Sequence, residues 1–208
     1  MKIFGVLGGE ALSDEILRAW VDWADFVIAA DAGFCNLSSA GLRPNLVVGD
    51  MDSVVHCEVP ESQKMIRISA QDSSDCDKLL SVAVELGARQ LSIGCMHGGR
   101  HDHLLANFAS ISKINLAVKV VLPLEIGVQV LPNNPITFEH FGRISLLPVV
   151  PCTGVNLSGV RWPLVDQSLA MDGLVSLSNE GTGEVTVSIE SGKAMLFVHT
   201  DPSQIPTW

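Results

Sequence analysis

The sequence predicts a mostly parallel α/β domain followed by a smaller all-β domain, which we interpret as a sandwich of antiparallel strands. Up to about residue 123, short apolar runs alternate with amphipathic stretches of helical period. Beyond it, apolar and polar residues alternate with a period of two, and no stretch fits a helix of usual length. We therefore expect two domains, at residues 1–124 and 125–208.

Six apolar runs in the first part predict buried strands, because polar residues or glycines bound each run. They lie at residues 3–7, 26–30, 46–48, 65–68, 91–93 and 118–122. Three helical stretches lie between them. The first follows the cap residue Ser13, the second follows Ser74 with Asp77 at the capping-box position, and the third begins near Asp102. This alternation indicates a parallel sheet covered on both faces.

Four segments of the second part alternate apolar and polar residues and predict antiparallel strands. They lie at residues 136–140, 143–147, 184–189 and 193–198. Turn-forming Gly, Asn and Pro residues separate them, and Gly142 is expected to divide the first two.

Composition excludes several classes of protein. Of the 208 residues, 47% are apolar, which is enough for a hydrophobic core and argues against disorder. The 13 basic and 23 acidic side chains give a net charge of −10, which argues against nucleic-acid or anionic-membrane partners. The longest uncharged segment, residues 144–160, contains prolines and glycines and predicts no membrane helix. Five cysteines without a CxxC pair favour buried thiols in a reducing cytoplasm over a disulfide framework or a zinc site. We expect a soluble cytoplasmic protein.

Carboxylates follow the predicted strands at the edge where an open parallel sheet binds its ligands. They are Asp31, Asp50, Asp52, Asp72, Asp75 and Asp102. Each one alone could cap a helix or form a turn. Their convergence on one edge favours a site for Mg²⁺, which prefers hard oxygen ligands.

The segment Gly49-Asp50-Met51-Asp52-Ser53 is the most informative of these strand ends. If the strand continues to Asp50, its alternation places Asp50 and Asp52 on the same side. Two close carboxylates need either a cation or a shared proton. Because the other acids converge here, we expect both to stay ionised and to bind metal.

Gly98-Gly99-Arg100 complements the acids. Paired glycines let backbone N–H groups approach an anion, and Arg100 can donate to two phosphate oxygens. Acids and loop together predict a site for Mg²⁺ and a polyphosphate, as phosphoryl transfer requires. By contrast, residues 5–9 match no nucleotide-binding motif and are interpreted as a structural turn. The spacing of His97, His101 and His103 fits no zinc motif.

These residues together resemble the thiamine pyrophosphokinase family. The resemblance spans most of the chain and rests on residues 30–33 (ADAG), 44–53 (PNLVVGDMDS), 72–78 (DSSDCDK), 98–107 (GGRHDHLLAN) and 178–180 (SNE). It implies a Rossmann-like α/β domain that binds ATP and Mg²⁺, and a β-sandwich domain that binds thiamine. It further implies a homodimer with the active site at the subunit interface, and transfer of pyrophosphate from ATP to the hydroxyl of thiamine, releasing AMP.

The resemblance also implies roles for individual residues. The implied metal ligands are Asp31, Asp50, Asp52 and Asp75. The implied catalytic residues are Asp50, Asp52, Asp75, Arg100 and Asp102. The implied ATP-binding residues are Asp31, Lys78, Gly98, Gly99, Arg100, His103 and Asn107, and the implied thiamine contacts are Ser178 and Asn179.

Four features depart from the family pattern: Asn45 where Asp is frequent, Gln71 where Lys is frequent, His97 as an extra residue before Gly98, and the turn at residues 159–162 (GVRW), which replaces the more usual leucine and tyrosine. None removes an acid from the cluster, but Gln71 and His97 bear on the phosphate contacts. Two alternatives stay open. One is a pyrophosphokinase for another hydroxymethyl acceptor such as a pterin, and the other is a nucleotide or thiamine sensor without turnover.

Overall fold

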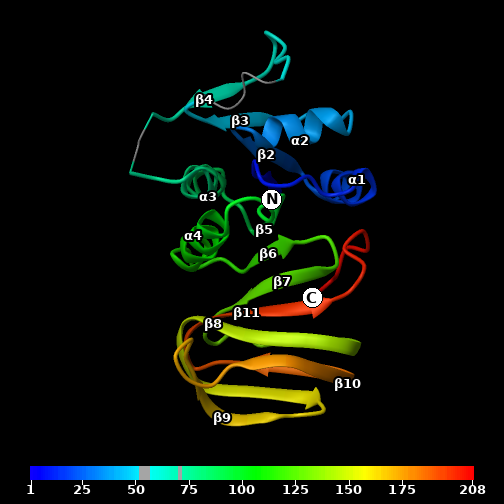
Figure 1. Cartoon of the computed structure of the whole chain (residues 1–208), viewed down its shortest axis with the longest axis vertical. Helices are drawn as coiled ribbons and strands as arrows, with labels where there is room; N and C mark the ends of the chain where they lie inside the picture. The colour runs from blue at the N-terminus through cyan, green and yellow to red at the C-terminus, as the bar shows by residue number, and fades with distance from the viewer. Residues whose placement is uncertain (52–56, 70–71) are drawn as a thin grey trace. The chain divides into compact units, whose positions relative to one another are not determined.

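The computed structural model describes residues 1–51, 57–69 and 72–208 of the chain (Figure 1). These residues form two compact units. The first comprises Met1–Pro123 and Pro202–Ile205, and the second comprises Leu124–Asp201 and Pro206–Trp208. The return of Pro202–Ile205 to the first unit is not foreseen by a linear division at residue 124. The buried indole of Trp20 holds this return, because its Nε1 donates a 2.7 Å hydrogen bond to the carbonyl of Pro202.

A parallel sheet forms the centre of the first unit. Its strands are β1 (Lys2–Val6), β2 (Phe26–Ala30), β3 (Leu46–Gly49), β4 (Met65–Arg67), β5 (Gln90–Gly94) and β6 (Val118–Val121). They lie in the order β6-β5-β1-β2-β3-β4, and each pairs in parallel with its neighbour. All six predicted strands are therefore present, with ends that differ by at most one residue. Ile3, Phe4, Ile28 and Ile93 are fully buried and make the strands the core of the unit.

Four helices accompany this sheet (Figure 1). They are α1 (Asp14–Trp23), α2 (Gly33–Ser39), α3 (Asp75–Glu85) and α4 (His101–Ser112). The predicted caps are present: the hydroxyl of Ser13 accepts from the N–H of Ile16, and Ser74 and Asp77 form a complete capping box. In the described part of the chain, the helices are all too short or too polar to span a lipid bilayer.

The seven-residue helix α2 was not predicted. Its sequence, GFCNLSS, contains few strong helix formers, so its intrinsic preference is weak. Phe34 and Leu37 are nevertheless fully buried, and this tertiary packing stabilises the helix where local propensity does not.

The second unit consists of strands. They are β7 (Glu125–Val130), β8 (Ile136–Val160), β9 (Leu164–Leu169), β10 (Ser176–Ser188) and β11 (Ser191–His199). Their order is β10-β8-β11-β7, with β9 paired to β8. The prediction that Gly142 separates two strands is wrong, because β8 continues through it for 25 residues. Gly142 has φ +147°, a backbone conformation that glycine adopts without steric cost, so the strand can bend there without ending.

The two arms of β8 flank β10. Thr186 of β10 is paired with Thr137 in the first arm and with Ser158 in the second. Alternate residues of these strands point inward and form one apolar cluster. Trp208 packs on this cluster, with its ring 4.6 Å from that of Phe138.

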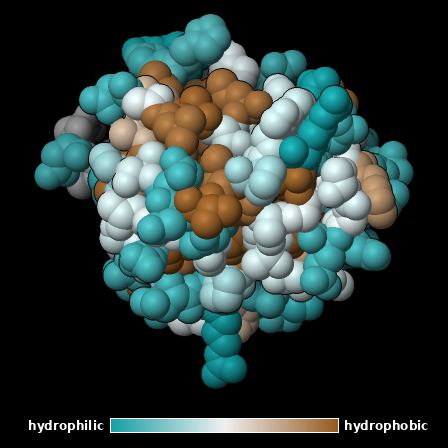
Figure 2. Space-filling model, turned by 90° about the horizontal axis from the view of Figure 1, so that it is seen from below, coloured by the Kyte–Doolittle hydropathy of each residue, from teal (hydrophilic) through white to brown (hydrophobic). Residues whose placement is uncertain are grey.

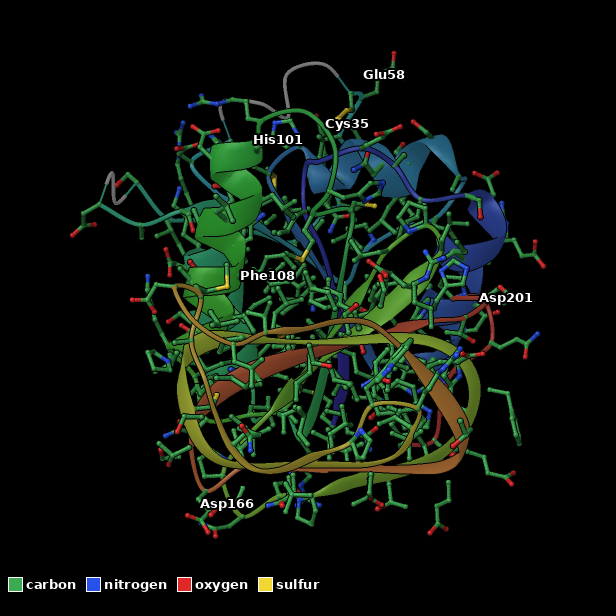
Figure 3. All side chains as sticks on the ribbon, turned by 60° about the horizontal axis from the view of Figure 1, so that its bottom comes forward. Cys35, Glu58, His101, Phe108, Asp166 and Asp201 are labelled. Atoms are coloured by element: carbon green, nitrogen blue, oxygen red, sulfur yellow. A yellow bond between two sulfur atoms is a disulfide. The ribbon has the colours of Figure 1, made fainter. Side chains whose placement is uncertain are left out.

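Cys35 and Cys57 form a disulfide, with their Cα atoms 5.7 Å apart. Figure 3 shows Cys35 beside the segment that carries Glu58. The expectation that all five cysteines are thiols is therefore wrong for this pair. Their separation of 22 residues has no motif that spacing could reveal. Cys76, Cys95 and Cys152 are buried thiols, as predicted.

Candidate active site

A pocket of about 740 Å³ lies in the first unit, at the carboxyl edge of the parallel sheet. Its wall comes from segments far apart in the sequence: residues 7–10 after β1, Asp50 after β3, residues 73–76 and Lys78 at the start of α3, and residues 98–100, His103 and Asn107 around the start of α4. The capping box of Ser74 and Asp77 fixes where α3 begins, and so places Asp75 and Lys78 at the pocket.

Lys78 is the positive centre of this pocket. Only 5% of the residue is exposed, and its Nζ lies 3.3 Å from Oδ1 of Asp75 and 3.5 Å from Oδ2 of Asp50. Burial alone would lower the pKa of Lys78, but the charges of Asp75 and Asp50 outweigh it, and its pKa lies above the ordinary value. The ammonium therefore stays charged and holds both carboxylates at one place.

The backbone around Asp50 differs from the predicted alternation. Strand β3 ends at Gly49, whose φ is +150°, and Met51 has φ +70°, so the strand does not continue through Asp50. The condition for Asp50 and Asp52 to alternate onto one side, a strand that continues to Asp50, is therefore not met. Asp52 lies outside the described residues, as does Gln71, and their predicted roles stay predictions.

Asp31 directly follows β2 and is 3% exposed. The N–H of Asp31 donates to the carbonyl of Val48. A Cβ added to Gly49 would lie 3.1 Å from the Cβ of Asp31. Glycine at 49 thus lets this carboxylate lie close to β3. Among the described residues, the pocket wall includes Ala32 but not Asp31.

The donor set suits a hard cation. In residues 1–51, 57–69 and 72–208, no three His, Cys, Asp or Glu side chains gather as a preformed metal site. Mg²⁺ does not require such a cage, because one or two carboxylates together with water and substrate phosphates complete its shell. Asp50 and Asp75, held by the same ammonium, supply two carboxylates in one pocket.

The glycine-arginine loop, residues 98–100, lines the same pocket as these acids. Gly98 and Gly99 have φ +79° and +64°, and Arg100 is the N-cap of α4. Arg100 donates from Nε and Nη2 to the two oxygens of Asp102, at 3.1 and 2.5 Å. This hydrogen bonding lowers the pKa of Asp102 to about 2. Asp102 therefore orients Arg100, which is exposed and lines the pocket.

Along α4, the predicted residues His103 and Asn107 also line the pocket. Figure 3 shows this helix running from His101 past Phe108. Cys76, on α3, lines the pocket as well, but burial, aided by the charge of Asp77, raises the pKa of its thiol to about 12. A neutral thiol is a poor nucleophile, so Cys76 is not suited to covalent catalysis.

Sequence reasoning missed one wall of the pocket. The interpretation of residues 5–9 as a structural turn does not include a binding role, yet Leu7, Gly8 and Gly9, together with the next residue, Glu10, line the pocket. A Cβ on Gly9 would lie 2.5 Å from the carbonyl oxygens of Cys95 and His97, so this position requires glycine. The available signal was two adjacent glycines at a strand end on the same edge as the acids.

Ser178 and Asn179 lie in the second unit. Asn179 is 2% exposed, and its amide donates to the carbonyl of Trp162 at 2.7 Å while its oxygen accepts from the N–H of Trp162. The side chain of Asn179 thus fixes the backbone of Trp162. Trp162 is 55% exposed, and Ser178, next to Asn179 in the chain, is exposed with φ +51°.

A parallel sheet with carboxylates, a buried lysine and glycine loops around one pocket defines an α/β enzyme that acts on phosphorylated nucleotides. Two family models match separate parts of the chain. The catalytic domain of thiamin pyrophosphokinase matches residues 17–122, and its vitamin B1 binding domain matches residues 135–196. The chain belongs to the thiamine pyrophosphokinase family, whose function is ATP-dependent transfer of pyrophosphate to thiamine.

Individual relatives agree with this assignment. The chain is 24% identical to thiamine pyrophosphokinase of Bacillus subtilis over 186 residues, covering 84% of this chain and 87% of the relative. It is 28% identical over 177 residues to thiamine pyrophosphokinase 2 of Arabidopsis thaliana, covering 74% of this chain and 64% of that longer protein. The crystal structure of thiamin pyrophosphokinase from Geobacillus thermodenitrificans superposes with a TM-score of 0.80 at 27% identity, covering 97% of this chain and 98% of that one.

Proposed function

We propose that this chain transfers a pyrophosphoryl group from ATP to the hydroxyl of thiamine in a Mg²⁺-dependent reaction that releases AMP. The observation that carries the proposal is one pocket that contains Asp50, Asp75 and Lys78 together with the Gly98-Gly99-Arg100 loop. Phosphoryl transfer depends mainly on positioning and on neutralising phosphate charge, and these residue types provide both.

In this proposal the triphosphate lies in the pocket between the acids and the loop. Asp50 and Asp75 hold Mg²⁺, with Asp31 and Asp52 as the further predicted ligands. The ion supplies charge neutralisation and orientation of the phosphates. Lys78 keeps the two carboxylates in place, and Arg100, oriented by Asp102, donates to phosphate oxygens.

The bonding changes balance without another reactant. The hydroxyl oxygen of thiamine forms a bond to the β-phosphorus of ATP, the bridge from the β- to the α-phosphate breaks, and AMP leaves. The hydroxyl proton is released as the new bond forms. No covalent enzyme intermediate is needed, in keeping with the absence of an activated nucleophile among the described pocket residues.

The second unit, as a β-sandwich, would bind thiamine, with Ser178 and Asn179 as the predicted contacts. Two observations support this assignment. Trp162 is exposed, and Asn179 holds its backbone; its ring already takes part in a cation–π contact with the guanidinium of Arg161, 4.9 Å from the ring centroid, so this aromatic surface can accept a cation such as a thiazolium. The match to a vitamin B1 binding model also covers this part of the chain.

We also propose a homodimer; the cytoplasmic location stays a prediction, because the Cys35–Cys57 disulfide removes the argument from free thiols. Large apolar side chains are exposed on the second unit, and Figure 2 shows apolar surface gathered on the face seen from below. The exposed residues include Phe141 (76%), Val165 (71%), Met171 (68%) and Leu177 (59%). Contiguous apolar surface of this kind is typical of an interface between subunits.

The test is an assay of nucleotide products with Mg²⁺-ATP and a panel of acceptors. We expect AMP and thiamine diphosphate with thiamine, no product after chelation of Mg²⁺, and no turnover of a hydroxymethyl pterin. ADP with thiamine monophosphate would disprove pyrophosphoryl transfer. Tight ATP and thiamine binding without any product would favour the sensor.

A further inference from the structure

We propose that Asn36 is a positioning residue for the nucleotide, acting through the glycine wall, which we define as residues 7–10. The inference deepens the proposed function and rests on it, since it assigns ATP to the pocket. Asn36 lies on α2 and is not among the described residues of the pocket wall, so it acts from behind the glycine wall.

One side of the glycine wall is fixed by its own N–H groups. Leu7 donates to the carbonyl of Gly94 at 3.1 Å, and Gly9 donates to that of Cys95 at 2.8 Å. Glu10 donates to the carbonyl of His97, also at 2.8 Å. These three bonds tie the glycine wall to the segment that leads from β5 towards the glycine-arginine loop.

Asn36 fixes the other side. Its Nδ2 donates to the carbonyl oxygens of Leu7 and Gly9, each at 3.0 Å. A single side-chain amide thus donates to two carbonyls that belong to alternate residues of the wall, and it also bonds the buried thiol of Cys95. The wall also lies tightly against the start of α2, because a Cβ on Gly8 would be 2.7 Å from the Cβ of Ala32.

These two bonds have an electrostatic consequence. A carbonyl oxygen is the negative end of its dipole and repels a polyphosphate. Asn36 draws two such oxygens towards itself and away from the pocket, so that Gly8, which is exposed, is the part of the wall presented between them. The amide therefore removes the repulsion that these two carbonyl oxygens would add to the charge of Glu10 in the same wall.

The chemistry requires asparagine. Aspartate has the same shape but no hydrogen to donate, and its charge would repel both carbonyls. Asn36→Asp is therefore a sharp test. We expect it to raise the Kd and KM for Mg²⁺-ATP roughly tenfold or more, the effect of losing two hydrogen bonds, while kcat and the KM for thiamine stay unchanged.

Asn45→Asp is the matched control, because it makes the same chemical change in the same unit. The oxygen of Asn45 accepts from the N–H of Val27 at 2.7 Å, and a carboxylate keeps this bond. Asn36→Ala is the second variant. It removes the donors without adding charge and should weaken ATP binding in the same direction, but less.

The readouts separate positioning from stability. ATP binding is measured by calorimetry on the full chain, and both KM values are measured by AMP release. Unchanged ATP binding in Asn36→Asp, an equal rise in both KM values, or failure of both Asn36 variants to fold would overturn the proposal. Failure of the wild-type protein to convert thiamine would count against the proposed function, whereas the calorimetric comparison would still test Asn36.

Discussion

The buried ammonium of Lys78 lies 3.5 Å from Oδ2 of Asp50, a residue 28 positions earlier in the chain. This ion pair joins the first turn of α3 to the end of β3. Because the same ammonium also contacts Asp75, the two carboxylates that we assign to Mg²⁺ depend on one cation for their placement.

Replacing Lys78 with methionine should lower kcat/KM for ATP on the order of a hundredfold, because the pocket loses its fixed positive charge and its two carboxylates repel each other. The measurement is steady-state AMP release. Lys113→Met is the control, since Lys113 also pairs with a carboxylate of α3, 2.7 Å from Asp77, at an exposed position away from the pocket wall. Normal turnover in Lys78→Met would reduce the pair to a structural role.

Asp50→Asn should reduce turnover on the order of a hundredfold and raise the Mg²⁺ concentration needed for half-maximal rate, because an amide is a weaker ligand than a carboxylate. A Mg²⁺ titration of AMP release measures both effects, and circular dichroism verifies the fold. The matched control is Asp166→Asn in the second unit. Asp166 has φ +48°, which asparagine also adopts, so this variant should behave as wild type. An unchanged Mg²⁺ requirement in Asp50→Asn would exclude Asp50 as a ligand.

Asp77 should make the stability of the protein depend on pH. Burial would raise its pKa, but hydrogen bonds from Lys113 and Ser74 outweigh burial and lower the pKa from 3.8 to about 2. A lowered pKa stabilises the folded state above the unfolded value, so this contribution is complete above pH 3.8 and is lost as the pH falls towards 2.

Urea unfolding of wild type and Asp77→Asn between pH 2 and 6 measures this dependence. The difference in unfolding free energy should be largest at the upper end and shrink towards pH 2. A difference that stayed constant across this range would show that the carboxylate does not titrate as inferred.

The Cys35–Cys57 disulfide should stabilise the first unit. A crosslink between residues 22 positions apart is worth roughly 3 kcal/mol through the restricted unfolded chain. The double variant Cys35→Ser, Cys57→Ser should lose about this much in urea unfolding, and reductant should destabilise wild type but not the double variant. Peptide mapping without reductant should recover the two cysteines as one crosslinked pair. Five free thiols in the untreated protein would contradict the bond.

The strands of the first unit could be predicted because their signal is local. Runs such as Phe26–Ala30 are apolar throughout and end at polar residues, as strands buried on both faces require. The caps Ser13 and Ser74 were equally visible, since a cap and its partner lie three residues apart. Helix α2 was missed because the burial of Phe34 and Leu37 comes from residues distant in sequence.

Part of the candidate site could also be predicted from the sequence, because its acids and its arginine follow strands that are themselves visible in the sequence. That Asp50, Asp75 and Arg100 share a pocket follows from one rule about strand ends. That Lys78 is buried between two acids, or that Asn36 holds two carbonyls of a distant loop, depends on how close particular atoms approach after folding. Periodicity and spacing carry no information about such approaches.

The return of Pro202–Ile205 to the first unit has a practical consequence for dissecting this protein. A single cut after Pro123 does not release two self-sufficient fragments, because the amino-terminal piece would lack these four residues. Trp20 would then carry a buried indole N–H without its acceptor, a penalty of about 1–3 kcal/mol. Proteolysis or gene splitting at this junction should therefore yield an amino-terminal fragment that recovers its stability when a peptide containing residues 202–205 is added in trans.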